Sequence, residues 1–82
     1  MKPDFYIVIE YCEEFEQALT LRQNKGQPTK GLLDWGNPVA LFPSRIEAKA
    51  AIDRTEHYRL AFDQGDQWPE KKYCKIVPAV KV

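Results

Sequence analysis

The side chains best suited to acid–base or nucleophilic chemistry are few in this chain and lie far apart in the sequence. His57 is the single histidine, and we expect it to project from the polar side of a helix, away from any nucleophile. Cys12 and Cys74 show neither a CxxC spacing nor a Cys/His pattern that would bind zinc. We therefore interpret the histidine as solvent-exposed and the cysteines as small apolar side chains. A disulfide would need neighbouring strands and an oxidising compartment.

The densest run of charge is acidic and comprises Glu10, Glu13, Glu14 and Glu16. Paired carboxylates hydrolyse glycosides or bind metals when a cleft holds them at fixed separations, which a hairpin turn rarely does. We interpret the run as a solvated turn, with a docking patch for a basic partner as the alternative. The sequence also lacks GxGxxG, Walker, HExxH and GxSxG motifs. It therefore predicts no catalytic residue, metal site or cofactor, and we expect a protein that is not an enzyme.

Two tryptophans lie in predicted loops, where an indole either packs onto the core or anchors an interface. For Trp35, which follows Asp34, we favour core packing, whereas Trp68 divides evenly between the two roles. Stacking on Trp68 beside basic residues would suit single-stranded nucleic acid. The chain has 12 basic and 12 acidic residues, however, and this balance does not predict a strongly basic face. The basic residues in question are Lys71, Lys72 and Lys75.

Two strands are predicted in the first part of the chain. Phe5–Tyr11 alternates with apolar residues on both faces, which is typical of a central strand. Glu13–Arg22 fits either a strand or a helix, and we favour a strand because a turn through residues 12–14 would pair it with the first. Residues 23–31 are rich in turn formers, and we expect residues 32–38 to continue that loop.

The strongest local signal is the start of a helix. Val39–Phe42 is a predicted short strand that ends at Pro43, and residues 44–47 (SRIE) then form a capping box in which Ser44 accepts from the N–H of Glu47. The helix is predicted over residues 44–62, with Gly65 beyond it as a stop signal. Its predicted buried stripe consists of Ala48, Ala51, Ile52, Thr55, Tyr58 and Phe62.

The remaining elements complete an α+β fold. Residues 63–72 are a predicted polar loop and Tyr73–Val77 a last strand, which Pro78 either places at a sheet edge or ends in a bulge. The order β(β)βαβ predicts a single domain, residues 1–82, with one helix packed on a small, mainly antiparallel sheet of three or four strands. The longest apolar run is five residues, so we expect no membrane span or signal peptide, and a small soluble cytoplasmic protein.

The stretch Trp35–Ile52 combines a tryptophan-containing loop, a short strand and a Phe-x-Ser-Arg-x-Glu-Ala sequence that opens the helix. In this pattern, and in its Val-Pro ending, the chain resembles small uncharacterised bacterial and phage-encoded proteins over about half its length. The resemblance implies an α+β fold and a phage or mobile-element origin, and it assigns no catalytic residues. The matching residues are Trp35, Phe42, Ser44, Arg45, Glu47, Ala48, Val77 and Pro78.

Our leading hypothesis is a non-enzymatic protein that binds a surface of a larger protein. If the resemblance holds, its concrete form is a host-directed inhibitor, such as an anti-CRISPR or other anti-defence protein. One alternative is a nucleic-acid accessory protein using Trp68 and the three lysines, and another is a homo-oligomeric module that pairs through the edge near Pro78. The sequence does not predict the oligomeric state. The predicted partner-binding residues are Asp34, Trp35, Trp68, Glu13, Glu14 and Glu16.

Overall fold

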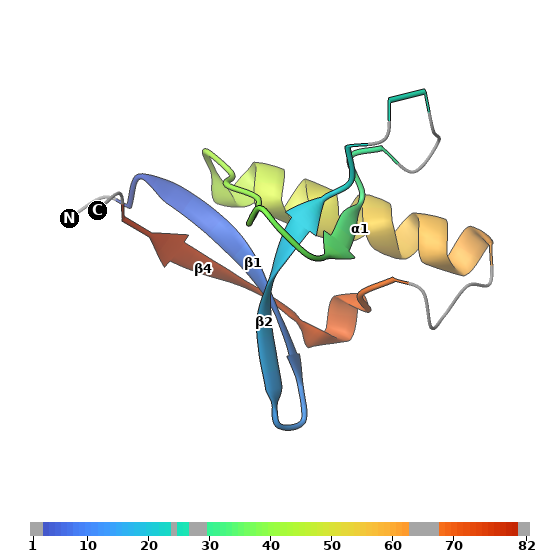
Figure 1. Cartoon of the computed structure of the whole chain (residues 1–82), viewed down its shortest axis with the longest axis horizontal. Helices are drawn as coiled ribbons and strands as arrows, with labels where there is room; N and C mark the ends of the chain where they lie inside the picture. Colours follow the sequence, from blue (N-terminus) through green and yellow to red (C-terminus); the bar gives the residue numbers. More distant parts are fainter. Residues whose placement is uncertain (1–2, 24, 27–29, 63–67, 81–82) are drawn as a thin grey trace.

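The computed structural model describes residues 3–23, 25–26, 30–62 and 68–80. It has a four-stranded antiparallel sheet in the order β3-β2-β1-β4, with a helix, α1, packed along it (Figure 1). This arrangement confirms the α+β class, the central position of the first strand and the edge position of the last. The elements are β1 (Phe5–Cys12), β2 (Phe15–Leu21), β3 (Leu33–Trp35), α1 (Arg45–Ala61), the 3-10 turn η1 (Lys71–Tyr73) and β4 (Cys74–Ala79).

The first two strands form a hairpin, so the ambiguous segment is a strand as favoured. Cys12 pairs with Phe15 across a two-residue turn, in which Glu13 adopts a left-handed conformation with φ of 54°. The pairing extends back to Ile9 and Ala18. The hairpin is therefore a regular two-stranded ribbon at its turn end.

The third strand is not where the sequence predicted it. Leu33–Trp35 was assigned to a loop, but it pairs antiparallel with Leu19–Leu21. The predicted strand Val39–Phe42 contributes a single bridge, in which Phe42 and Tyr6 exchange two backbone hydrogen bonds of 2.8 Å. A three-residue strand is too short for its alternation to be recognised, and its pairing depends on a partner distant in the sequence.

The helix begins as its capping signal predicted. The Ser44 side chain accepts from the Glu47 N–H at 3.2 Å, and the Phe62 N–H closes the last turn on the Tyr58 carbonyl at 3.1 Å. The first two-thirds of the predicted stripe is buried, whereas Tyr58 is half-buried and Phe62 exposed. The proposed stop at Gly65 lies outside the described residues. The buried helical residues are Ala48, Ala51, Ile52 and Thr55.

The core lies between α1 and one face of the sheet. Val8 is fully buried there with Leu19 and Leu33, and Tyr6 and Ile76 pack against the same cluster. Because side chains alternate along a strand, the odd-numbered residues of β1 face away from α1. None of the helices in the described part of the chain has the length and apolarity needed to cross a membrane.

The end of the chain differs in detail from the prediction. Tyr73 belongs to η1 rather than to the last strand, which begins at Cys74 and runs through Pro78 to Ala79. The two lysines assigned to a loop, Lys71 and Lys72, form the rest of that 3-10 turn. The last strand still pairs with β1 along its full length, from Glu10 back to Phe5.

Candidate functional site

An exposed cluster of aromatic and acidic side chains lies at the end of the β1–β2 hairpin, residues 11–16, which we call the hairpin tip. Phe15 is 72% exposed and Tyr11 50% exposed. Three of the predicted partner-binding residues lie beside them, and all three are exposed: Glu13, Glu14 and Glu16. Figure 1 shows the tip projecting away from α1. The structure thus brings the acidic run together with two solvent-facing rings.

The sheet ends before the tip, which explains why the tip is exposed. On one side, β3 reaches only as far as Trp35, opposite Leu19. On the other side, β4 begins at Cys74, opposite Glu10. The last residues of the hairpin therefore form a two-stranded ribbon that neither neighbouring strand covers. A protruding ribbon of this kind can enter a groove on a larger molecule.

Trp35 lies at the base of the hairpin. Its indole N–H donates to Oε1 of Glu10 at 2.6 Å, a bond that spans β2 because the two residues lie on β3 and β1. The Trp35 side chain is 37% exposed, so it is neither the core residue that we favoured nor a free surface anchor. Of the four acidic residues, Glu10 is thus held in place, while the three at the tip remain in solvent.

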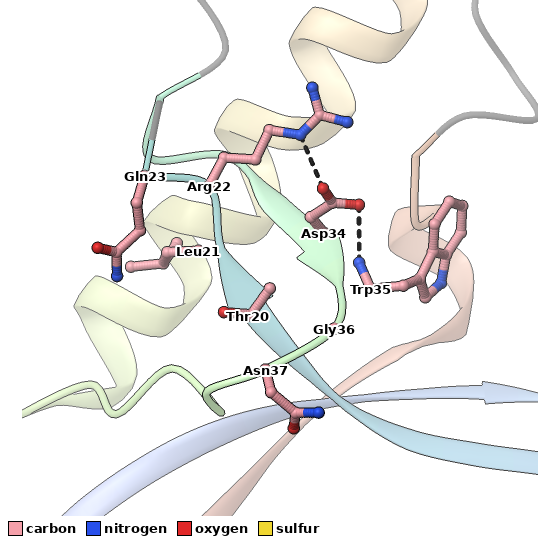
Figure 2. Close-up of a pocket in the computed structure, with 8 residues that line it drawn as sticks. All are labelled: Thr20, Leu21, Arg22, Gln23, Asp34, Trp35, Gly36 and Asn37. Atoms are coloured by element: carbon pink, nitrogen blue, oxygen red, sulfur yellow. Dashed lines mark hydrogen bonds and ion pairs between the residues drawn. The ribbon is translucent and has the colours of Figure 1, made fainter. Parts of the chain in front are cut away.

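Asp34 has a structural role that accounts for both of its carboxylate oxygens. Its Oδ2 accepts from Nε of Arg22 at 2.8 Å, and its Oδ1 accepts from the Trp35 backbone N–H at 2.8 Å (Figure 2). These residues line a shallow depression of about 470 Å³ at the ends of β2 and β3. Because the carboxylate is already engaged, Asp34 is better placed to hold the strands together than to meet a partner.

Trp68 is buried, at 3% exposure, so of its two predicted roles the structure shows core packing. The guanidinium of Arg22 lies 3.9 Å from the centre of a Trp68 ring, and Tyr58 meets the indole edge-on at 5.4 Å. Arg22 therefore links Asp34 to Trp68. The ring is not presented for stacking with nucleic-acid bases.

The three lysines named for nucleic-acid binding do not form a free basic patch. Lys71 Nζ forms an ion pair with Oδ1 of Asp53 at 2.9 Å, and this contact raises the pKa of the lysine. Lys72 lies 3.4 Å from Glu70. Lys75 is exposed, with its Nζ 5.9 Å from the centre of the Tyr11 ring. Two of the three charges are thus compensated locally, and the aromatic partner they would need is buried.

The two edges of the sheet offer few outward N–H groups to an added strand. At β3, the Leu33 N–H donates to Oγ1 of Thr55 at 2.9 Å, and the Trp35 N–H is taken by Asp34. At β4, Pro78 lies opposite Tyr6 of β1. The N–H and C=O of Tyr6 both bond with Phe42, so the Tyr6–Pro78 pair is not hydrogen-bonded.

It follows that the Pro78 nitrogen faces outward, where it carries no donor. The Cys74 N–H also faces outward by the same alternation, and it is taken by the Lys71 carbonyl. Within β4, Ile76 is the residue that keeps an outward N–H. Strand addition, including pairing between copies near Pro78, therefore has little support from either edge.

The residues with potential chemistry remain separate. Cys12 and Cys74 are free thiols, and burial raises the pKa of Cys74 to about 12, with Glu10 and Glu56 contributing. His57 is exposed, as expected. Among the described residues, no three His, Cys, Asp or Glu side chains are grouped as a metal site would require.

The sequence reasoning missed Tyr11 and Phe15 as surface residues. Both were assigned to the apolar faces of strands, because alternation does not reveal where a sheet ends. The available signal was the position of Phe15 directly after Glu13 and Glu14, since a ring that follows a charged two-residue turn has few neighbours to cover it.

Comparison with known proteins gives no relative for this chain: no family model matches it, and no curated protein or solved structure matches it significantly.

Proposed function

We propose that this chain is a non-enzymatic binding protein that inserts its hairpin tip into a groove on a larger protein with a basic rim. The observation that carries the proposal is the combination of Phe15, 72% exposed, with exposed Glu13 and Glu14 on a ribbon that projects from the sheet. Aromatic residues, phenylalanine included, are enriched at the core of protein–protein interfaces. Surrounding carboxylates speed the encounter with a basic surface and fix the register.

The sheet edges, with few outward N–H groups, support the same mode of binding. A partner that added a strand would need outward N–H groups, but those of Leu33 and Trp35 are already taken by side chains. Contacts through side chains remain, and the tip presents two exposed rings beside three exposed carboxylates. The host-directed inhibitor implied by the sequence resemblance is a specific form of this proposal and stays a prediction.

The experiment places a photo-crosslinking phenylalanine analogue at position 15 and identifies the protein it captures from host lysate. Affinity for that protein is then measured for the wild type, Phe15→Ala and the Glu13→Lys/Glu14→Lys double variant. Removing an anchoring ring costs about 2 kcal/mol, or ~30-fold in Kd. We expect Phe15→Ala to weaken binding by that factor, and the double variant to lower the association rate and its salt dependence.

Phe62→Ala is the matched control, because Phe62 is a 57% exposed phenylalanine at the far end of α1. It should bind like the wild type. A captured protein whose affinity is unchanged by Phe15→Ala and by the double variant would overturn the proposal. Steeply salt-dependent micromolar binding to single-stranded DNA or RNA would favour the nucleic-acid alternative instead.

A further inference from the structure

The face of the sheet opposite α1 is apolar along its centre. Phe5, Ile7 and Ile9 of β1 point to this side, and they are half-buried without belonging to the core cluster. Val77 pairs with Ile7 and Ala79 with Phe5, so β4 widens the same apolar strip. We call this strip the open face. Apolar patches of a few hundred Å² occur on ordinary monomers and are often functional.

Two opposite charges flank the open face near the hairpin end. Lys75 on β4 pairs with Ile9, and Glu16 on β2 pairs with Tyr11. Lys75 Nζ lies 5.9 Å from the Tyr11 ring, which places both side chains on the open face. Since β1 lies between the two outer strands, the cation and the anion are about two strand spacings, ~10 Å, apart.

We propose that the open face is an interface with a second copy of this chain, related by a two-fold axis that runs parallel to β1 between the stacked sheets. Rotation about this axis keeps each residue at its level along the strand and exchanges the β4 side with the β2 side. The Lys75 side chain extends from the level of Ile9 towards the ring of Tyr11, which is the level of Glu16. The ammonium of one copy therefore comes opposite Glu16 of the other, and the contact occurs twice because the interface is isologous. The apolar centres, with Ile7 and Val77, stack on each other.

The charges select this axis over the alternatives. A two-fold axis across the strands would reverse the levels, so Lys75 would meet the apolar strip near Phe5 and would no longer face Glu16. Pairing through an edge is disfavoured because Thr55 covers the β3 edge and Pro78 removes a donor from β4. The chain's net charge of +0 adds no general repulsion between copies.

The size of the open face sets the strength of the dimer. The eight residues of β1 span about 26 Å, and over most of that length a single neighbouring strand flanks them, which makes the face about 9 Å wide. The footprint is therefore roughly 240 Å² per copy. This is below the roughly 800 Å² per partner of stable complexes. The dimer is therefore weak, and its population depends on concentration.

The first test is sedimentation velocity of the wild type between 10 µM and 1 mM. We expect the sedimentation coefficient to rise from the monomer value towards the dimer value. Ile7→Lys should remain monomeric, whereas Ile46→Lys should dimerise like the wild type, because Ile46 is 81% exposed on α1 and lies off the open face. A wild type that is monomeric at 1 mM overturns the proposal.

The second test exchanges the two charges, which both lie on exposed side chains. Lys75→Glu and Glu16→Lys should each weaken self-association at least about tenfold, because each places like charges opposite each other. Mixing the two variants should restore dimers of one copy of each, since both contacts then join a lysine to a glutamate. A mixture that stays monomeric, or single variants that dimerise like the wild type, would refute the geometry. Phe15→Ala should dimerise normally, so failure here is distinguishable from failure of tip docking.

Discussion

Thr55 provides the sharpest test of how the β3 edge is closed. The residue is 1% exposed, its Oγ1 accepts from the Leu33 N–H at 2.9 Å, and its hydroxyl donates to the Ala51 carbonyl at 2.8 Å. Thr55→Val keeps the β-branched shape and nearly the same helix propensity. The substitution therefore isolates the hydroxyl that joins α1 to the edge strand.

The expected loss of stability follows from the hydrogen bonds that Leu33 and Ala51 keep when the Thr55 hydroxyl is removed. The Leu33 N–H, on a fully buried residue, is left without an acceptor, which costs about 1–3 kcal/mol. The Ala51 carbonyl keeps its helical bond, so its loss is small. We expect Thr55→Val to lower the free energy of unfolding by about 2 kcal/mol, from a total of roughly 4–12 kcal/mol for a chain of this length. With a urea dependence of about 1 kcal/mol per molar, the midpoint falls by about 2 M.

Urea unfolding followed by circular dichroism measures this loss, and two variants serve as controls. Thr55→Ser keeps the hydroxyl and loses a methyl group, at a cost of about 1 kcal/mol. Thr20→Val alters the other buried threonine of the described residues, whose hydroxyl makes no hydrogen bond there, and should stay within about 0.5 kcal/mol of the wild type. Amide exchange at Leu33 should quicken in Thr55→Val alone. Equal losses in the two valine variants, with unchanged Leu33 exchange, would refute the reasoning.

Three further predictions test the helix cap, the strand clamp and the buried thiol. Ser44→Ala should lower the unfolding free energy by about 1 kcal/mol and Ser44→Gly by a few tenths, measured by urea unfolding. Asp34→Ala should cost about 1–2 kcal/mol by the same measurement, because a guanidinium and the Trp35 N–H lose their acceptor. With a pKa of about 12, Cys74 should react with iodoacetamide at pH 8 about 10³-fold more slowly in folded Cys12→Ser protein than in the unfolded chain. Equal rates in the two states would contradict its burial.

The burial of Cys74 also fixes the direction of a pH effect. The folded state raises the pKa of this thiol, so the unfolded chain ionises first as the pH rises. The stability associated with the protonated thiol is present below about pH 8.5, the ordinary value for cysteine, and is lost between there and about 12. Cys74→Ala should remove this part of the alkaline decline.

The parts of the fold that were predicted correctly depend on neighbours in the sequence. The cap at Ser44 acts within one helical turn, and the helix begins there. Apolar residues on both faces of Phe5–Tyr11 indicated a strand with neighbours on each side, and β1 is central. Pro78 has no backbone N–H to donate and is therefore tolerated in an edge strand, and β4 is an edge strand.

The parts that were wrong or left open depend on contacts between distant segments. Leu33–Trp35 becomes a strand because Leu19–Leu21 pairs with it and Thr55 covers its outer side. Trp68 is buried because Arg22 and Tyr58 enclose its ring, and neither is near it in the sequence. Local patterns carry no information about such partners. The sequence therefore could not show that Leu33–Trp35 forms a strand, nor decide whether Trp68 is buried or exposed.

The sequence predicted only part of the candidate site, because the rest again depends on contacts between distant segments. A run of glutamates at a turn indicated an exposed acidic hairpin, but the exposure of Phe15 and Tyr11 depends on where β3 and β4 end. The bond from Trp35 to Glu10 depends on the register of three strands at once. Composition therefore suggests the charge of this surface, while topology determines its shape.

The alternation of side chains separates the two proposed surfaces on one hairpin. Phe15 shares a face with Cys12 and the core side of the sheet, whereas Glu16 and Tyr11 share the open face. A two-fold axis parallel to β1 keeps levels along the strands, so both hairpin tips of a dimer project from the same end. The dimer would then present two tips to one partner surface, and a weak self-association would raise the apparent affinity of docking without any new contact at the tip. Ile7→Lys should consequently weaken docking on a partner with two sites and leave docking on a single site unchanged.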